Sequence, residues 1–162
     1  MLAALALAVV AIGAGCGGGA GGNTTGASSS SNGFSPYELK MQALGQQLGA
    51  TLARIGLSNV NQPPAVIVRH LAAAQLQLRD AAVKLAAIEA PAKIKADQAL
   101  LLKGVREYAD GLNSLIRQLR VPTKDKLAYL SILQKIAALK GVKDMQDASL
   151  AITKAGYLIT LK

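Results

Sequence analysis

Apolar side chains recur every three or four positions from residue 35 to the end of the chain, and this spacing is typical of amphipathic helices. The clearest stretch follows Pro63-Pro64, where seven successive positions of helical spacing are all apolar. These positions are Ile67, Leu71, Ala74, Leu78, Ala81, Leu85 and Ile88. No segment shows the apolar–polar alternation of a strand. The pattern therefore predicts an all-α fold.

Capping residues, prolines and glycines indicate where the helices begin and end. The sequence Ser35-Pro36-Tyr37-Glu38 has the form of a capping box with proline at the first helical position, and it predicts a helix reaching about Gly56. Pro91 must interrupt the second stretch near Glu89. Later boundaries are expected at Val121-Pro122, at Thr123 as the cap of a fourth helix, and at Gly141.

The connections between these helices are short, so consecutive helices are expected to be antiparallel neighbours. We predict an up-and-down bundle of four to five helices over residues 35–162, which is long enough to bury a core. The two segments on either side of Gly141 fit one kinked helix or a helical hairpin equally well.

The N-terminal 37 residues carry no charged side chain, and their first part has the order of an export signal. Leu2 to Ile12 is an apolar run of about eleven residues, which spans only about half of a ~30 Å hydrocarbon core. Gly13, Ala14 and Gly15 then precede Cys16. Small residues directly before a cysteine resemble the lipobox of bacterial lipoproteins. The resemblance implies cleavage of residues 1–15, acylation of Cys16, and a lipid anchor at the extracytoplasmic face of the cell membrane.

Residues 16–34 are expected to form a disordered tether, because Gly, Ser, Thr and Asn cannot bury enough apolar area to offset the entropy of ordering. Its root-mean-square reach is roughly 24 Å. Such tethers are similar to those of actinobacterial lipoproteins. The spacing of Leu85, Ile88, Pro91, Ile94, Leu101 and Gly104 also resembles a helix hairpin in actinobacterial lipoproteins. That resemblance implies no activity.

The body of the chain is strongly basic, with 18 Lys and Arg residues against nine Asp and Glu. Such an excess favours anionic partners such as phospholipid headgroups or acidic envelope polymers, although solubility alone explains it equally well. Lys93 and Lys95 are expected at the end of the bundle that the tether joins, together with Lys40. If the last helix folds back at Gly141, Lys140 and Lys143 reach the same end.

Few residues are available for catalysis or metal binding. One His and one Cys leave no Ser-His-Asp set and no cysteine-based zinc site. We therefore expect no enzymatic activity, no cofactor and no metal, and no nucleic-acid motif occurs. Gln98 and Tyr108 lie on the apolar stripe of one helix and are candidates for lining a pocket.

Two functions remain open from the sequence. The first is a membrane-anchored, extracytoplasmic lipoprotein whose basic bundle acts as an envelope interaction or accessory module. The alternative is a bundle at the cell surface that binds a small molecule, a solute or a lipid. A cavity near Gln98 and Tyr108 would favour the alternative, whereas a solid core there would favour the first.

Overall fold

The computed structural model describes residues 34–56, 62–121 and 125–157, and the account below concerns those residues. The segments predicted to be an export signal and most of the predicted tether, with Cys16, Thr123 and the last five residues, lie outside them. The helices are α1 (Pro36–Gly56), α2 (Pro64–Ala86), a short 3-10 helix η1 (Ala92–Ile94), α3 (Lys95–Leu119), α4 (Lys126–Gln134) and α5 (Val142–Lys154). The described residues contain no strand, so the all-α prediction is confirmed.

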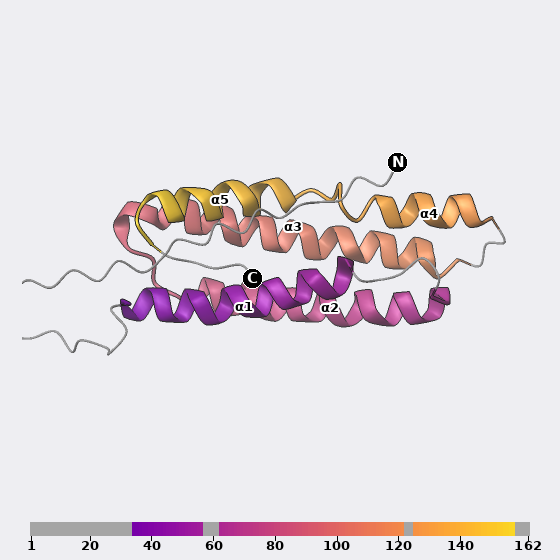
Figure 1. Cartoon of the computed structure of the whole chain (residues 1–162), viewed down its shortest axis with the longest axis horizontal. Coiled ribbons are helices and arrows are strands. Elements are labelled where there is room, and N and C mark those ends of the chain that lie inside the picture. Colours follow the sequence, from indigo (N-terminus) through magenta and orange to yellow (C-terminus); the bar gives the residue numbers. More distant parts are fainter. Residues whose placement is uncertain (1–33, 57–61, 122–124, 158–162) are drawn as a thin grey trace, which may run out of the picture.

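The helices form an up-and-down bundle in which α1, α2 and α3 alternate in direction (Figure 1). The helices α4 and α5 lie end to end along α3 and run in the same direction, so the fourth column of the bundle is a broken helix (Figure 1). The chain does not fold back at Gly141. The linker makes successive tight turns in which an amide bonds to the carbonyl three residues earlier, as from Ala138 to Lys135.

Local capping explains the helix boundaries. The capping box at α1 is present: the Ser35 amide and hydroxyl each donate to Glu38 Oε2 at 2.8 Å, and the Glu38 amide donates to Ser35 Oγ at 3.3 Å. At α4 the cap is Asp125, whose Oδ1 accepts from the Leu127 amide at 2.8 Å and from the Ala128 amide at 3.3 Å. The expected cap, Thr123, lies outside the described residues.

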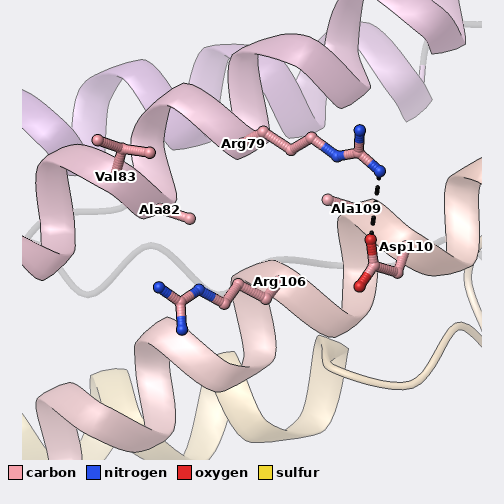
Figure 2. A pocket seen from close by; sticks show the side chains of 6 residues that line it. All are labelled: Arg79, Ala82, Val83, Arg106, Ala109 and Asp110. Atoms are coloured by element: carbon pink, nitrogen blue, oxygen red, sulfur yellow. Dashed lines mark hydrogen bonds and ion pairs between the residues drawn. The ribbon is translucent and has the colours of Figure 1, made fainter.

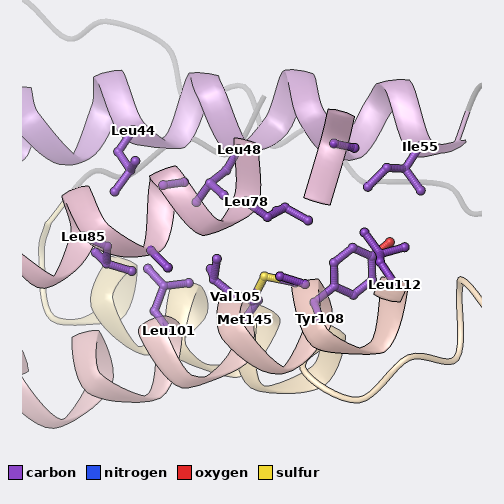
Figure 3. Close-up of a cluster of buried hydrophobic side chains, with 14 of the residues drawn as sticks. Leu44, Leu48, Ile55, Leu78, Leu85, Leu101, Val105, Tyr108, Leu112 and Met145 are labelled. Atoms are coloured by element: carbon purple, nitrogen blue, oxygen red, sulfur yellow. The ribbon is translucent and has the colours of Figure 1, made fainter. Parts of the chain in front are cut away.

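The core is built from one apolar face each of α1, α2, α3 and α5 (Figure 3). Of the seven apolar positions assigned to the second helix, the six up to Leu85 are buried, and Ile88 is half-buried beyond the helix end. The helix α4 is different, because Leu127 is 76% exposed and no described side chain between residues 125 and 140 is fully buried. The helix α4 is therefore held to the bundle by a shallow contact.

A close approach between backbones fixes the start of α5 against α3. Gly141 has φ +99°, and a Cβ placed on Gly104 would lie 2.9 Å from both the Gly141 carbonyl oxygen and the Met145 amide nitrogen. The end of α5 is tied to the start of α1 by Tyr37 and Tyr157, whose rings pack edge to face at 5.5 Å. No described helix has the combined length and apolarity needed to cross a membrane.

Candidate functional site

The bundle has two ends, or poles, with different surfaces. The near pole is formed by residues 34–40, 87–97 and 153–157, and it includes the start of α1, which residues 16–34 precede in the sequence (Figure 1). The far pole is formed by residues 62–70, 116–121 and 125–132. The 25 residues of α3 run from one pole to the other, which separates them by about 38 Å at 1.5 Å per residue.

Three of the predicted lysines lie at the near pole. Lys40, Lys93 and Lys95 are all exposed there, and Lys93 Nζ donates to the Ala155 carbonyl oxygen at 3.0 Å. This bond holds the end of α5 against the turn between α2 and α3. Lys154 in the last turn of α5 adds a fourth cation that sequence reasoning did not place at this pole.

Acidic residues partly offset these cations. Glu38, Glu89 and Asp97 also lie at the near pole, so the four lysines leave a net charge of only +1 there. The Glu38 carboxylate is engaged in the capping box of α1. The near pole is therefore a surface of mixed charge with exposed lysines.

Lys140 and Lys143 do not join this group, because α5 does not fold back at Gly141. Both lie at the start of α5, beside the middle of α3. Lys140 Nζ is 3.3 Å from Glu107 Oε1, and Lys143 pairs with Asp147 one turn along α5. The predicted cluster of five lysines is thus divided between two regions of the surface.

Ion pairs occupy the middle of the bundle. Lys103 Nζ lies 2.7 Å from Asp144 Oδ2 and joins α3 to α5, and this bond lowers the pKa of Asp144 and raises the pKa of Lys103. Lys84 Nζ lies 2.7 Å from Asp80 Oδ2 and lowers the pKa of that carboxyl in the same way. These carboxylates already have cationic partners within the protein.

Gln98 and Tyr108 are buried in the core, and neither lines either of the two cavities described below. The Gln98 Nε2 group donates to the carbonyl oxygens of Leu85 at 3.1 Å and Ile88 at 2.6 Å, at the end of α2. Burial raises the pKa of Tyr108 to about 12, so its hydroxyl stays neutral at physiological pH. In the structure the Gln98 side chain therefore caps the C-terminal end of α2.

A small cavity of about 270 Å³ lies between α2 and α3 (Figure 2). Arg79 Nη2 on α2 and Asp110 Oδ1 on α3 form an ion pair 3.3 Å apart across it, and Arg106 lies on the same side of α3. Both members of the pair are more than half exposed, so the pair adds about 0–1 kcal/mol of stability. Because Asp110 already neutralises Arg79, the cavity offers an anionic ligand only Arg106.

A larger groove of about 770 Å³ lies at the far pole, where the start of α2, the end of α3 and α4 meet. Its wall is mostly apolar, and its two charged residues are both arginines. The lining residues are Pro63, Pro64, Ala65, Val68, Arg69, Gln118, Leu119, Arg120, Val121, Tyr129 and Ile132. A volume of this size is typical of sites for small molecules.

Three arginines of the far pole have no anionic partner among the described residues. Arg69, Arg117 and Arg120 are exposed, and none of them forms an ion pair with any described residue. The sequence contains a signal for this surface, since no acidic residue occurs between Glu38 and Asp80 or between Asp110 and Asp125. Sequence reasoning missed the site because its residues come from three separate segments.

Two of the five buried side-chain polar atoms without a partner among the described residues lie at the far pole. The Tyr129 hydroxyl is buried and has no hydrogen-bond partner among the described residues. The same is true of Oε1 of Gln62, the residue directly before Pro63. Burial raises the pKa of Tyr129, so the hydroxyl keeps its proton and remains a donor. A buried donor without a partner destabilises the unliganded protein.

The residues that the structure describes contain no group of three or more His, Cys, Asp or Glu side chains arranged to hold a metal ion. Of the two cavities described above, the far-pole groove has the larger volume, and we take it as the candidate site. Comparison with protein-family models, with curated proteins and with solved structures finds no match to this chain.

Proposed function

We propose that the protein is a bacterial lipoprotein, anchored by acylated Cys16 at the extracytoplasmic face of the cell membrane, and that it acts there as a non-catalytic interaction or accessory module. The apolar run, small residues and cysteine at positions 2–16 support the anchor. One structural observation carries the membrane orientation: the chain joins the bundle at the pole that exposes Lys40, Lys93, Lys95 and Lys154. In this proposal the near pole faces the lipid headgroups.

In this orientation each lysine contributes modestly to the attraction between the protein and the membrane, and the contributions add. A lysine close to an anionic membrane surface contributes about 1 kcal/mol, and salt screens the attraction beyond roughly 8–10 Å. Lys95 lies in the first turn of α3, where a cation opposes the helix dipole. Its presence there is unfavourable to folding and favourable to contact with an anionic surface.

The anchor is tested by metabolic labelling with a palmitate analogue. The wild-type chain should incorporate the label, should sediment with membranes and should lack residues 1–15, because two acyl chains hold a protein durably. The Cys16→Ala variant should show no label and should be released. Equal labelling of both proteins, or an intact N-terminus by mass spectrometry, would contradict the proposal.

The orientation is tested by sedimentation of the Cys16→Ala protein with anionic vesicles. Reversal of Lys93 and Lys95 to Glu should weaken binding at low salt by about tenfold or more, since four charge units change at the surface. The same reversal places anions at the start of α3, where they stabilise the helix by about 0.3–1 kcal/mol each. Because Lys93→Glu also removes the hydrogen bond from Lys93 Nζ to the Ala155 carbonyl oxygen, circular dichroism of the variant checks that the end of α5 stays folded.

Two control variants make this test specific. Reversal of Arg106 and Lys135, exposed cations of the middle region, changes the net charge equally and should affect binding much less. Reversal of Arg69 and Arg120 tests the far pole. If the far-pole variant loses binding while the near-pole variant keeps it, the proposed orientation is wrong.

A second candidate function, the binding of a small molecule, is favoured by the far-pole groove. The groove has an apolar wall and two arginines without anionic partners. Neither Gln98 nor Tyr108, where sequence reasoning looked for a pocket, lines it. The two functions are compatible, because the near pole and the groove are about 38 Å apart.

A further inference from the structure

The far-pole groove combines an apolar wall with an exposed apolar residue at its rim. Val68 of α2, Leu119 of α3 and Ile132 of α4 supply the apolar wall from three helices. Val121, which also lines the groove, is 64% exposed. Water in contact with this surface is released when an apolar ligand covers it, which favours binding.

The positive charge of the groove favours an anionic ligand. Arg69 on α2 and Arg120 on α3 both line it, and no acidic residue does. Arg117 lies one helical turn before Arg120 and Val121 on α3, so it adds a third cation beside the rim. In the smaller cavity Arg79 forms an ion pair with Asp110. In the groove, Arg69 and Arg120 form no ion pair with any described residue. The groove is therefore suited to a ligand with an anionic head.

The wall of the groove also offers a hydrogen-bond donor. The Tyr129 hydroxyl is buried without a partner and retains its proton, since burial raises its pKa. A ligand oxygen that reached it would relieve the cost of leaving it unpaired. The helix α4 that carries Tyr129 has no fully buried side chain in the described structure, so it can move slightly to admit a ligand.

The shape and charge together fit one class of ligand. A polyanion would need a row of cations along its length, whereas here the cations sit beside an apolar wall. A polar small anion would leave the apolar wall exposed to water. A single acyl chain with one anionic head uses both features, and the volume of about 770 Å³ lies within the range of small-molecule sites.

We propose that the far-pole groove binds a single-chain anionic amphiphile of the fatty-acid type, with the head at Arg69 and Arg120 and the chain along Val68, Leu119 and Ile132. The proposal deepens the second candidate function and is independent of the membrane anchor. A chain that lacks acylation therefore tests it separately: loss of membrane anchoring leaves the groove intact.

The test is isothermal titration of the Cys16→Ala protein with monomeric dodecanoate. Saturable binding with one ligand per chain is expected, and decanoate should bind about 15-fold more weakly, because each buried methylene contributes about 0.8 kcal/mol. Replacement of both Arg69 and Arg120 by Gln should weaken dodecanoate binding about tenfold, while binding of the neutral dodecanol should stay within about twofold. Dodecylammonium should bind more weakly than dodecanol.

Matched variants assign the effect to the groove. Ala65→Trp fills the groove from an exposed position of α2 and should weaken dodecanoate and dodecanol alike. Ala86→Trp, also exposed on α2 but at its other end, should leave both affinities unchanged. Replacement of Arg79 and Arg106 by Gln removes the same charge elsewhere and should have little effect. Circular dichroism confirms that each variant remains folded.

Several results would overturn the proposal. Wild-type protein that shows no saturable binding of dodecanoate would do so, as would equal binding of dodecanoate and dodecylammonium. An equal loss in the Arg79/Arg106 variant would show that the effect depends only on net charge. Binding to anionic vesicles without any binding of the monomeric amphiphile would show that the far pole contacts membranes and is not an amphiphile site.

Discussion

Replacement of Gly141 by Ala should lower the free energy of unfolding by about 2–4 kcal/mol. Gly141 has φ +99°, a conformation that costs a residue with a Cβ about 1–2 kcal/mol. A Cβ there would also collide with the Gly104 carbonyl oxygen, where α3 and the start of α5 meet. Urea denaturation followed by circular dichroism measures the loss.

Three other glycines serve as controls for this result. Gly156 has nearly the same φ, +98°, but a Cβ there meets nothing within 4 Å, so Gly156→Ala should cost only the backbone strain. Gly104→Ala brings a Cβ against backbone atoms, partly offset by the higher helix propensity of alanine. At Gly111 the obstacle is the flexible end of Leu139, so Gly111→Ala should be nearly neutral.

The order of these effects tests the packing of α5. If Gly141→Ala and Gly156→Ala cost the same, backbone strain explains both and the backbone contact between α3 and α5 contributes nothing. If Gly111→Ala proves the most damaging, the described contact is wrong.

The sequence predicted α1, α2 and α3 well because their signals are local. The capping box at Ser35, the prolines at 63–64 and the break at Pro91 act within one helical turn, and the apolar stripes identify the buried faces. The course of the chain after Gly141 was left open for the opposite reason. It depends on the missing side chain of Gly104, a residue 37 positions earlier, which lets the backbone of α5 approach α3.

The candidate site was harder to predict than the fold. Its two arginines are 51 residues apart, and only the antiparallel arrangement of α2 and α3 brings them to one pole. Lys140 and Lys143 illustrate the same limitation. They reach the near pole only if the last helix folds back at Gly141, and the direction of α5 shows that it does not. The acid-free windows that surround Arg69 and Arg120 were present in the sequence, but their position in space was not. Acylation of Cys16 stays a prediction.

Gln98 is the site of the second large effect on stability. Its side chain is 7% exposed, and Nε2 donates to the carbonyl oxygens of Leu85 and Ile88 at the end of α2. The last carbonyls of a helix have no partner within it, so an outside donor is needed. Gln98→Leu, which keeps the volume and removes the donor, should cost about 1–3 kcal/mol.

Gln98→Glu should be more damaging at neutral pH, by about 3–5 kcal/mol, because a buried carboxylate would face carbonyl oxygens without a counter-charge. The cost should depend on pH in a definite direction. Burial raises the pKa of the new carboxyl above its value in the unfolded chain, so the stability is present below the unfolded pKa of about 4.3 and is lost as the pH rises through the folded pKa. The protonated carboxyl can also donate one hydrogen bond to a carbonyl, which the ionised form cannot.

The measurement is the free energy of unfolding of the wild type, Gln98→Leu and Gln98→Glu at several values between pH 4 and pH 7. The difference between wild type and Gln98→Leu should stay constant over this range, since neither side chain titrates. The difference between wild type and Gln98→Glu should grow as the pH rises. A pH-independent difference for Gln98→Glu would mean that the side chain reaches water, and Gln98 would then not be the group that closes the end of α2.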